Sequence, residues 1–322
     1  MCIYLIVHTH ETIRAGEEIR YILSDRPSLV SPKATAGPVQ VSQSNGDSNE
    51  VDFTVKLSDT YYFAEGTTRD NPNDGTYEEW LCLQNPGATI ANVTLTYMLG
   101  DGTTEVQKVT VEKESRLTVS VNDFLGADKD VSTLVESDQL ILAERPMYFN
   151  YRNKWTGGHD VMGATAPRDT YFFAEGTTRD NINDGSYEEW LCLQNPGGAD
   201  ADVKVTYMLG TGRNIEETYP VGATSRETID VNTAVGPDQD VSMLIESTQP
   251  IVAERPMYFN YRNKWTGGHD VVGAPATDRS RSGCACRTRA TPTPMSPLPT
   301  TPRAGRHPDR GCHGGGQEPP HR

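Results

Sequence analysis

Short runs of alternating apolar and polar residues, each ended by turn residues, fill the middle of the chain. In ANVTLTYML, Val93, Leu95 and Tyr97 fall on one side and the residues between them on the other, as in a strand with one solvated face. About eight such runs follow one another at the spacing typical of an all-β sandwich or barrel, and no segment keeps a helical period. They are YYFAEG, YEEWLCLQ, ANVTLTYML, EVQKVTV, RLTVSV, STLVES, LILAERPMYFNY and HDVMGA.

This pattern occurs twice. Thr60 onward aligns without a gap with Thr170 onward, an offset of 110 residues, which is the size of a small domain. The block ERPMYFNYRNKWTGGHDV is identical at 144–161 and 254–271, whereas only five of the twenty positions from 101 to 120 agree with their counterparts. We therefore predict two antiparallel β-sandwich repeats, 60–169 and 170–277, with a solvent-facing hairpin over 101–120. The connecting GATAPRDT has little slack, so the repeats should sit end to end.

The order of the motifs resembles a known family. YFAEGTT, EEWLCLQNPG, VTYMLG, SRLTVSVND, DVSTLVES and LILAERPMYFNY followed by GGHDVMGA look like the tandem repeats of a domain-of-unknown-function family from bacterial, notably actinobacterial, secreted and cell-surface proteins. The resemblance covers about residues 60–275. It implies an array of extracellular immunoglobulin-like β-sandwiches within a larger surface protein, acting as a spacer or display stalk, and it carries over no enzymatic activity.

Composition narrows the function further. The net charge is -15 and the mean hydropathy is -0.57, so the chain should repel nucleic acid, and no run approaches the roughly 20 apolar residues of a membrane helix. The opening MCIYLIVHTHETIRAG lacks the basic start and the cleavage site of a signal peptide. An extracellular or cell-surface location therefore comes from the resemblance alone. Residues 1–59 are interpreted as the remnant of a preceding module or a linker, with a strand near 51–57.

The two ends differ from the repeats. Residues 278–322 contain no aromatic residue, and eight prolines, eight arginines and three acids give this segment a charge of +5. Such a composition predicts disorder. Two interpretations remain open: a basic tail that contacts an anionic wall polymer, or sequence read out of frame or past a truncated gene end. The abrupt change in composition favours the second.

The duplicated block contains the single histidine of each repeat. His159 and Asp160 are adjacent, so on a strand they point to opposite faces and cannot act as a base and its orienting partner. Neither a histidine-rich zinc site nor a GxSxG nucleophile motif is present, so we predict no catalytic residues and no enzyme. We expect Gly157 and Gly158 to form a turn and the His159 and Asp160 side chains to hydrogen-bond to loop backbone.

A polar loop offers a candidate calcium site in each repeat. TTRDNPNDGTYEE and TTRDNINDGSYEE supply the hard oxygen ligands that calcium takes. The register of an EF-hand fails, because proline and leucine fall where an oxygen ligand and a glutamate belong. The alternative is a local turn cluster of Asn, Asp and Gly. The candidate ligands are Asp70, Asn73, Asp74 and Glu78 in the first repeat and Asp180, Asn183, Asp184 and Glu188 in the second.

Aromatic residues suggest a second binding function. Tyr148 and Trp155, with their counterparts Tyr258 and Trp265, could present an apolar platform to a glycan or a cell-wall polymer. Core packing is the ordinary alternative for aromatic residues in a small sandwich. The other strand face, with Met147, Phe149 and Tyr151, is expected to fill the core. The leading interpretation is a non-catalytic spacer, and a wall- or glycan-binding module is the alternative.

Two further expectations concern cysteine and arginine. Cys82 and Cys192 occur once per repeat inside an apolar run, so we predict buried thiols and no disulfide within a repeat. Arg145 precedes a proline within an apolar strand and needs a carboxylate there. We predict that it pairs with Glu65 as an ordering contact, and that Arg255 pairs likewise with Glu175.

Overall fold

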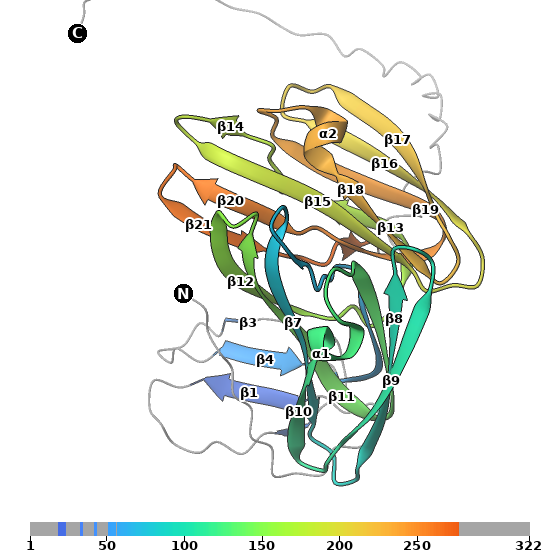
Figure 1. Ribbon diagram of the computed structural model, residues 1–322. Helices are drawn as coiled ribbons and strands as arrows, with labels where there is room; N and C mark the ends of the chain where they lie inside the picture. The colour runs from blue at the N-terminus through green and yellow to red at the C-terminus, as the bar shows by residue number, and fades with distance from the viewer. Residues whose placement is uncertain (1–18, 24–32, 35–41, 44–50, 56, 277–322) are drawn as a thin grey trace, which may run out of the picture. The chain divides into compact units, whose positions relative to one another are not determined.

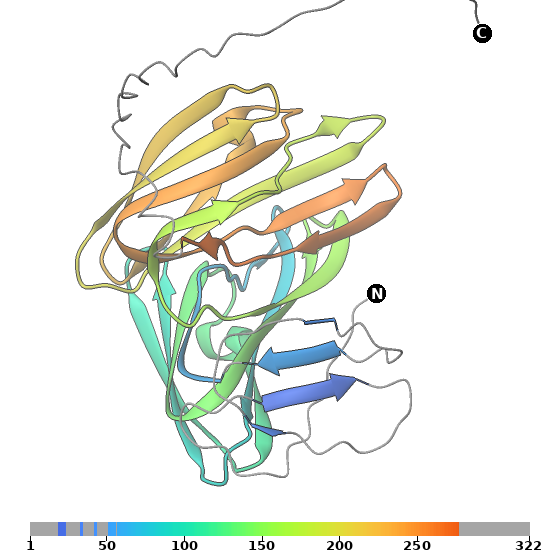
Figure 2. The same ribbon diagram turned by 180° about the vertical axis from the view of Figure 1, so that it is seen from behind.

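The protein is all-β. The computed structural model describes residues 19–23, 33–34, 42–43, 51–55 and 57–276. The N-terminal strands β1 (Ile19–Leu23), β2 (Lys33–Ala34), β3 (Ser42–Gln43) and β4 (Val51–Val55) form an antiparallel sheet of order β2-β1-β4-β3. β4 confirms most of the strand predicted near 51–57, and Figure 2 shows it beside β1. The predicted disordered tail lies outside the described residues.

The first repeat is a sandwich of two antiparallel sheets that share one long strand. β11 (Val131–Tyr151) pairs through its first half with β5 and β8, and through its second half with β7 and β12. The two sheets are therefore β5-β11-β8-β9 and β10-β7-β11-β12. The other elements are β5 (Ser58–Phe63), β6 (Asp70–Asn71), β7 (Gly75–Asn85), β8 (Ala91–Leu99), β9 (Thr104–Val111), β10 (Ser115–Ser120), α1 (Val121–Leu125) and β12 (Trp155–Met162).

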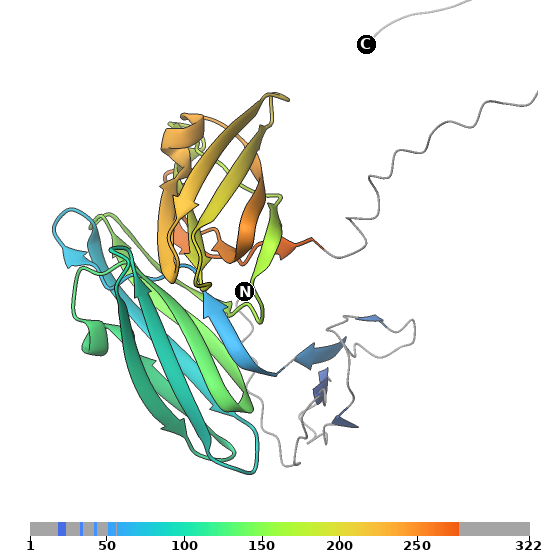
Figure 3. The same cartoon turned by 90° about the vertical axis from the view of Figure 1, so that its right-hand side faces the viewer.

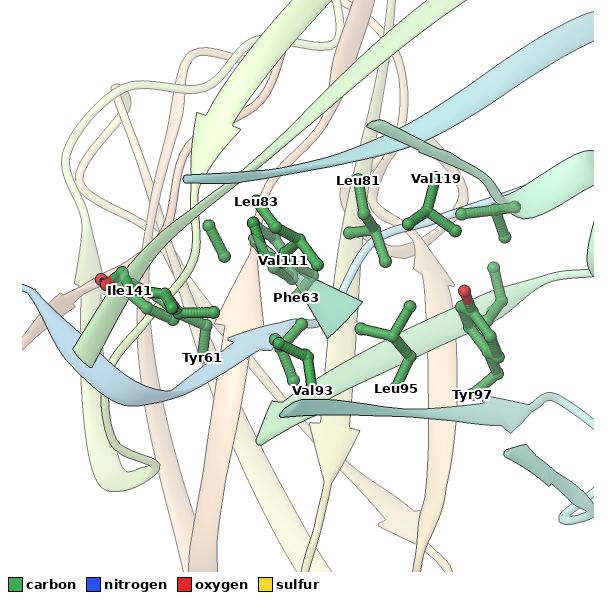
Figure 4. Close-up of a cluster of buried hydrophobic side chains, with 14 of the residues drawn as sticks. Tyr61, Phe63, Leu81, Leu83, Val93, Leu95, Tyr97, Val111, Val119 and Ile141 are labelled. Carbon is green, nitrogen blue, oxygen red and sulfur yellow. Dashed lines mark hydrogen bonds between the residues drawn. The ribbon is translucent and has the colours of Figure 1, made fainter. Parts of the chain in front are cut away.

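The core lies between these sheets and follows from the alternation in the sequence. Val93, Leu95 and Tyr97 of β8 are almost fully buried, as predicted, and pack with Leu81 and Leu83 of β7 (Figure 4). Burying such side chains contributes on the order of 1.5 to 3 kcal/mol each. The Tyr61 hydroxyl donates to the carbonyl of Ile141 at 2.9 Å, which satisfies the polar end of a buried ring.

The second repeat has the same order of elements. The Tyr171 hydroxyl donates to the carbonyl of Ile251 at 3.0 Å, which matches the contact of Tyr61. The long strand is interrupted here, into β19 and β20, at the Arg255–Pro256 step where β11 continues. The elements are β13 (Arg168–Phe173), β14 (Asp180–Asn181), β15 (Gly185–Asn195), β16 (Ala201–Leu209), β17 (Asn214–Val221), β18 (Ser225–Asp230), α2 (Val231–Val235), β19 (Val241–Glu254), β20 (Met257–Tyr261), β21 (Trp265–His269) and β22 (Ala274–Pro275).

The divergent segment 101–120 matches the predicted hairpin only in part: its tip and β9 form an exposed arm with β8, whereas β10 pairs with β7 in the other sheet. β8 and β9 lie side by side in Figure 3, and most side chains of β9 are exposed or half-buried. After β10 the chain makes a one-turn helix that the sequence analysis missed. Its N-cap is Ser120, whose hydroxyl accepts the backbone N–H of Asp123. Five residues are too few to show a helical period, which explains the omission.

The predicted turn at Gly157 and Gly158 is wrong. The chain reverses at Arg152 and Asn153, which both have positive φ, and the two glycines lie within β12 opposite Phe149 and Tyr148. Their lack of a side chain is required by packing, since a Cβ at Gly157 would meet the Phe149 ring at 2.8 Å. Asparagine tolerates the left-handed conformation and so supports the turn instead.

The two repeats belong to one compact unit. The connecting segment is short and is fixed to the first repeat by two backbone hydrogen bonds. The N–H of Tyr62 donates to the carbonyl of Ala164 at 2.8 Å, and the N–H of Ala164 donates to the carbonyl of Tyr62 at 2.9 Å. No helix in the described part of the chain is long and apolar enough to span a membrane.

Candidate functional site

The duplicated block places a buried arginine at the centre of the first candidate site. The Arg145 side chain is fully buried in β11, and its Nη1 donates to the carbonyl of Glu65 at 2.6 Å and also to the Glu65 carboxylate. The predicted Arg145–Glu65 pair is therefore confirmed. The matching pair in the second repeat is confirmed as well, with Arg255 Nη2 at 2.5 Å from the Glu175 carboxylate.

Arg145 also crosses to the second repeat. Its Nη2 lies 2.7 Å from a carboxylate oxygen of Asp270 and 3.5 Å from one of Glu254. The same Glu254 oxygen accepts the backbone N–H of Glu65 at 2.8 Å. One guanidinium is thus surrounded by three buried carboxyl groups, two of which come from the other repeat. We name Glu65, Arg145, Glu254 and Asp270 the charge cluster.

The charge cluster contains more acid than base, and its pKa values reflect this imbalance. Burial raises the pKa of Glu254 well above its usual range, and the neighbouring Asp270 raises it further. Half-buried His159 lies beside the cluster, where burial lowers its pKa to about 4. The imidazole is therefore neutral at pH 7. A proton held on Glu254 lowers the net charge of the buried group, which makes its burial less unfavourable.

Glu65, His159 and Asp270 have ligand atoms within 4.8 Å of one another, a spacing that a metal ion could bridge. Arg145 already contacts both carboxylates and supplies the positive charge that a metal ion would bring. A dication placed there would face a guanidinium at short range. The residues present therefore fit an internal ion-pair network and not a metal site. Both ring nitrogens of His159 lack hydrogen-bond partners in the described part.

Aromatic side chains form the second half of the same contact. The Tyr258 ring stacks on Tyr151 with centroids 4.3 Å apart, and meets the edges of Phe149 at 4.9 Å and Tyr77 at 6.2 Å. Met147, Phe149 and Tyr151 are buried, as expected. However, they belong to a cluster separate from the sandwich core, which Tyr258 of the second repeat completes.

Polar contacts surround this aromatic cluster. Glu188 accepts hydrogen bonds from the Tyr151 hydroxyl and, at 2.8 Å, from Arg152 Nη1. Arg226 Nε donates to the Ser132 hydroxyl at 3.2 Å. All these contacts join one repeat to the other. The two sandwiches therefore meet through buried aromatic and charged side chains with polar contacts around them, the usual anatomy of a specific contact.

Identical residues differ in exposure between the repeats, which corrects the predicted glycan platform. Trp155 is 3% exposed but Trp265 is 50% exposed, while Tyr148 is 57% exposed and Tyr258 only 5%. The expectation that all four present a surface is wrong for Trp155 and Tyr258, because the other repeat covers them. Tyr148 and Trp265 keep their exposed rings.

The candidate calcium loops are held by their own hydrogen bonds. Thr76 donates to the carboxylate of Asp70 at 3.1 Å, and the Asn71 side chain bonds Asp74 at 3.2 Å and Asp128 at 2.7 Å. The second loop repeats these contacts. Within the described ranges, the side chains of these loops form no group of three acidic, histidine or cysteine residues close enough to share a metal ion. Glu188 instead contacts the first repeat. The geometry is that of an Asn/Asp turn cluster.

Each repeat also buries one lone glutamate. Glu79 and Glu189 are fully buried. Within the described part of the chain, no donor forms a hydrogen bond of normal geometry with their carboxylate oxygens. Burial raises the pKa of Glu189 to about 8 and that of Glu79 well above its usual range. The oxygens lie against the backbone at Gly66 and Gly176, where a Cβ would come within 3 Å of them. These glutamates therefore pack under the AEGTT turn of each repeat as largely protonated side chains.

The cysteines behave as predicted in part. Cys82 and Cys192 are both free thiols, but only Cys192 is buried, since it lies in the contact between repeats beside Ala64 and Val252. Burial raises the pKa of the Cys192 thiol to about 12, so it is unreactive at neutral pH. The remaining cysteines lie outside the described residues.

Sequence analysis did not identify the roles of Glu254, Asp270 and Arg226 in joining the repeats. Their counterparts Glu144, Asp160 and Arg116 are identical residues that make none of these contacts across the interface. Nothing in a duplicated sequence distinguishes the copy that is covered from the copy that is not.

Comparisons with known proteins identify no family. No family model and no curated protein matches the chain. Among solved structures, the crystal structure of Thermotoga maritima 1070 matches with a TM-score of 0.31 at 16% identity, covering 34% of this chain and 96% of that one. The Anabaena sensory rhodopsin transducer matches with a TM-score of 0.25 at 24% identity (28% and 87%), and red sea bream transglutaminase with 0.14 at 9% (69% and 32%). TM-scores this low support no functional argument.

Proposed function

We propose that the chain is a non-catalytic spacer of a bacterial cell-surface protein, in which two β-sandwich repeats are docked as one stiff body that holds neighbouring modules apart. The observation that supports this most is the charge cluster, where Arg145 of one repeat is held by Glu254 and Asp270 of the other. A buried ion pair adds little net stability over apolar residues, but breaking it is costly, so it favours one arrangement of the repeats. The family resemblance supports the surface location.

The stiffness of the pair has a direct test. Tyr258→Ala removes the ring that fills the aromatic cluster and should cost roughly 3 to 5 kcal/mol, because it leaves a cavity at the contact. Tyr148→Ala is the matched control, since the identical residue is 57% exposed and should change stability by no more than about 0.5 kcal/mol. Calorimetry of the full chain should show both repeats unfolding in one cooperative transition, split into two by Tyr258→Ala.

Separate melting of the two repeats in the unmodified chain would contradict a stiff spacer.

A glycan- or wall-binding module remains the second candidate, because Tyr261 and Trp265 form an exposed stacked pair with centroids 5.8 Å apart and Lys264 lies 4.5 Å from the Trp265 ring. Flat exposed rings of this kind suit sugar stacking.

Retention of the full chain on purified cell wall and on a glycan panel, with calcium and with chelator, separates the two functions. A spacer is not retained. Saturable retention that Trp265→Ala abolishes and Tyr148→Ala preserves would assign binding to the second repeat, and loss of retention under chelator would restore the calcium loops as candidates.

A further inference from the structure

The contact between the repeats uses two different surfaces, each present twice in the chain. The aromatic face consists of Glu65, Tyr77, Phe149, Tyr151 and Trp155 in the first repeat, and its counterparts in the second are Glu175, Tyr187, Phe259, Tyr261 and Trp265. The sheet face consists of Cys192, Arg226, Val252, Glu254 and Tyr258 in the second repeat, with Cys82, Arg116, Leu142, Glu144 and Tyr148 as its counterparts in the first. One aromatic face covers one sheet face. The other copy of each remains uncovered.

The uncovered aromatic face already has the geometry of the covered one. Tyr261 stacks on Trp265 at 5.8 Å and 22°, while Tyr151 stacks on Trp155 at 5.8 Å and 28°. Arg262 lies over Tyr261 at 5.1 Å, as Arg152 lies over Tyr151 at 5.2 Å. No rearrangement of these rings is needed before a partner binds, which lowers the entropic penalty of association.

The uncovered sheet face is prepared in the same way. Arg116 Nη2 lies 3.2 Å from the Cys82 sulfur, and Arg226 Nη2 lies 3.6 Å from that of Cys192. Arg116 is exposed, as is Tyr148, so both are available to a partner. Between the two copies of these faces only Val252 and Leu142 differ, and both are aliphatic.

We propose that the aromatic face of the second repeat binds the sheet face of the first repeat in a second copy of this chain, repeating the contact seen within one chain. Tyr148 of the second copy would take the place of Tyr258, between Phe259 and Tyr261. Its Asp160 would take the place of Asp270 and reach Arg255. The partner is identified by the chain itself, which contains one completed example of this interface.

Such a contact joins unlike surfaces, so it leaves one free face at each end and propagates. The chain should therefore form a head-to-tail series of species larger than dimers, not a closed symmetric dimer. Within one chain the connecting segment supplies a high effective concentration, which two separate chains lack. The net charge of -15 also opposes association, so it should require high protein concentration and physiological salt.

Two variants and their mixture test the proposal in the full chain. Tyr148→Glu blocks the sheet face and Tyr261→Glu blocks the aromatic face, and both positions are exposed, at 57% and 39%. Ile182→Glu is the matched control, because Ile182 is 88% exposed and belongs to neither face. Sedimentation equilibrium at about 0.15 M salt measures the size of each species over a wide concentration range, and circular dichroism establishes that each variant is folded.

The unmodified chain and Ile182→Glu should associate beyond dimers as concentration rises. Each blocked variant alone should lose association by at least about tenfold, the effect typical of a central interface residue. Their equimolar mixture should form a 1:1 dimer and stop there, since only one pair of intact faces remains.

A chain that stays monomeric up to millimolar concentration, blocked variants that still associate, or a mixture that stays monomeric would each overturn the proposal. This inference does not depend on the proposed function. A chain that melts as one cooperative unit but never associates would contradict the proposed self-association and remain consistent with the proposed spacer function.

Discussion

At the residue scale, two identical arginines show how the environment sets the importance of a side chain. Arg145 contacts three buried acids, two of them from the other repeat. Arg255 is also buried, but its partner Glu175 is 61% exposed, and His269 lies 3.4 Å from the guanidinium. His269 and Arg255 together lower the pKa of Glu175, which solvent can hydrate if the arginine is lost.

We therefore expect Arg145→Ala to lower the free energy of unfolding by about 3 to 5 kcal/mol, because it leaves buried carboxylates without a counter-charge. Arg255→Ala should cost less, about 1.5 to 3 kcal/mol, the range for one hydrogen bond to a charged group. Urea denaturation of both variants measures the difference. Equal losses would mean that the contact between repeats adds nothing to the role of Arg145.

The sequence predicted part of this arrangement. An arginine within an apolar strand needs a carboxylate, and the choice of Glu65 and Glu175 for that role is confirmed. It could not predict Glu254 and Asp270, because these contacts depend on how two folded repeats dock. The local pattern of apolar and polar residues predicts which side chains are buried within a repeat, and it did so correctly for Val93, Leu95 and Tyr97. It carries no information on how two folded repeats dock.

At the element scale, the hairpin of β11 and β12 depends on a glycine from a neighbouring strand. Gly75 begins β7 with φ of +90°, and a Cβ there would lie 2.0 Å from the carbonyl oxygen of Asn150 in β11. Gly102 has a similar φ of +81° at the tip of the β8–β9 hairpin, but nothing lies within 4 Å of its Cβ position. Comparing substitutions at Gly75 and Gly102 therefore distinguishes the effect of backbone strain from the effect of a steric clash.

Gly102→Ala should cost about 1 kcal/mol, the strain of a left-handed alanine. Gly75→Ala should cost roughly 1 to 3 kcal/mol more, because the pairing of β7 with β11 must open to admit the methyl group. Thermal unfolding monitored by circular dichroism compares the two variants. If they shift the melting temperature equally, the backbone conformation alone matters at both sites.

Strand existence was predictable and strand boundaries were less so. The alternation of apolar residues located the strands of the repeats, although STLVES and LILAERPMYFNY form the single strand β11. The Gly157–Gly158 pair was misread as a turn because glycine is common in turns. Its actual role, allowing the Phe149 ring to lie against β12, is a tertiary requirement. The one-turn helices escaped for the opposite reason, since they are set by a cap at Ser120 or Asp230 and not by periodicity.

At the scale of the whole molecule, buried acids should make stability depend on pH. The folded-state pKa of Glu189 is raised from 4.5 to about 8, so its contribution is fully present below pH 4.5 and is lost as pH rises towards 8. Glu79 and Glu254 act in the same direction. His159, with its pKa lowered to about 4, acts in the opposite direction, since its contribution is lost as pH falls from 6.5 to 4.

The free energy of unfolding should therefore fall between pH 6.5 and 8, by up to about 1.4 kcal/mol per pH unit for each such glutamate. Glu189→Gln, which keeps the shape without the ionisation, should reduce this slope. Glu78→Gln, at an exposed position, should leave it unchanged. Denaturant midpoints at pH 6.5, 7.3 and 8 provide the measurement, and a slope that Glu189→Gln does not alter would place the dependence elsewhere.

The covering of the aromatic face of the first repeat has a consequence for biosynthesis. On the ribosome the first repeat is complete about 110 residues before the second, so Tyr151 and Trp155 emerge without the ring that will cover them. At the ordinary rate of translation this interval lasts roughly 6 to 20 s, far longer than a small sandwich needs to fold. Nascent chains on one polysome would then expose uncovered aromatic side chains to one another. Slowing elongation within the second repeat should therefore increase aggregation of the nascent chains.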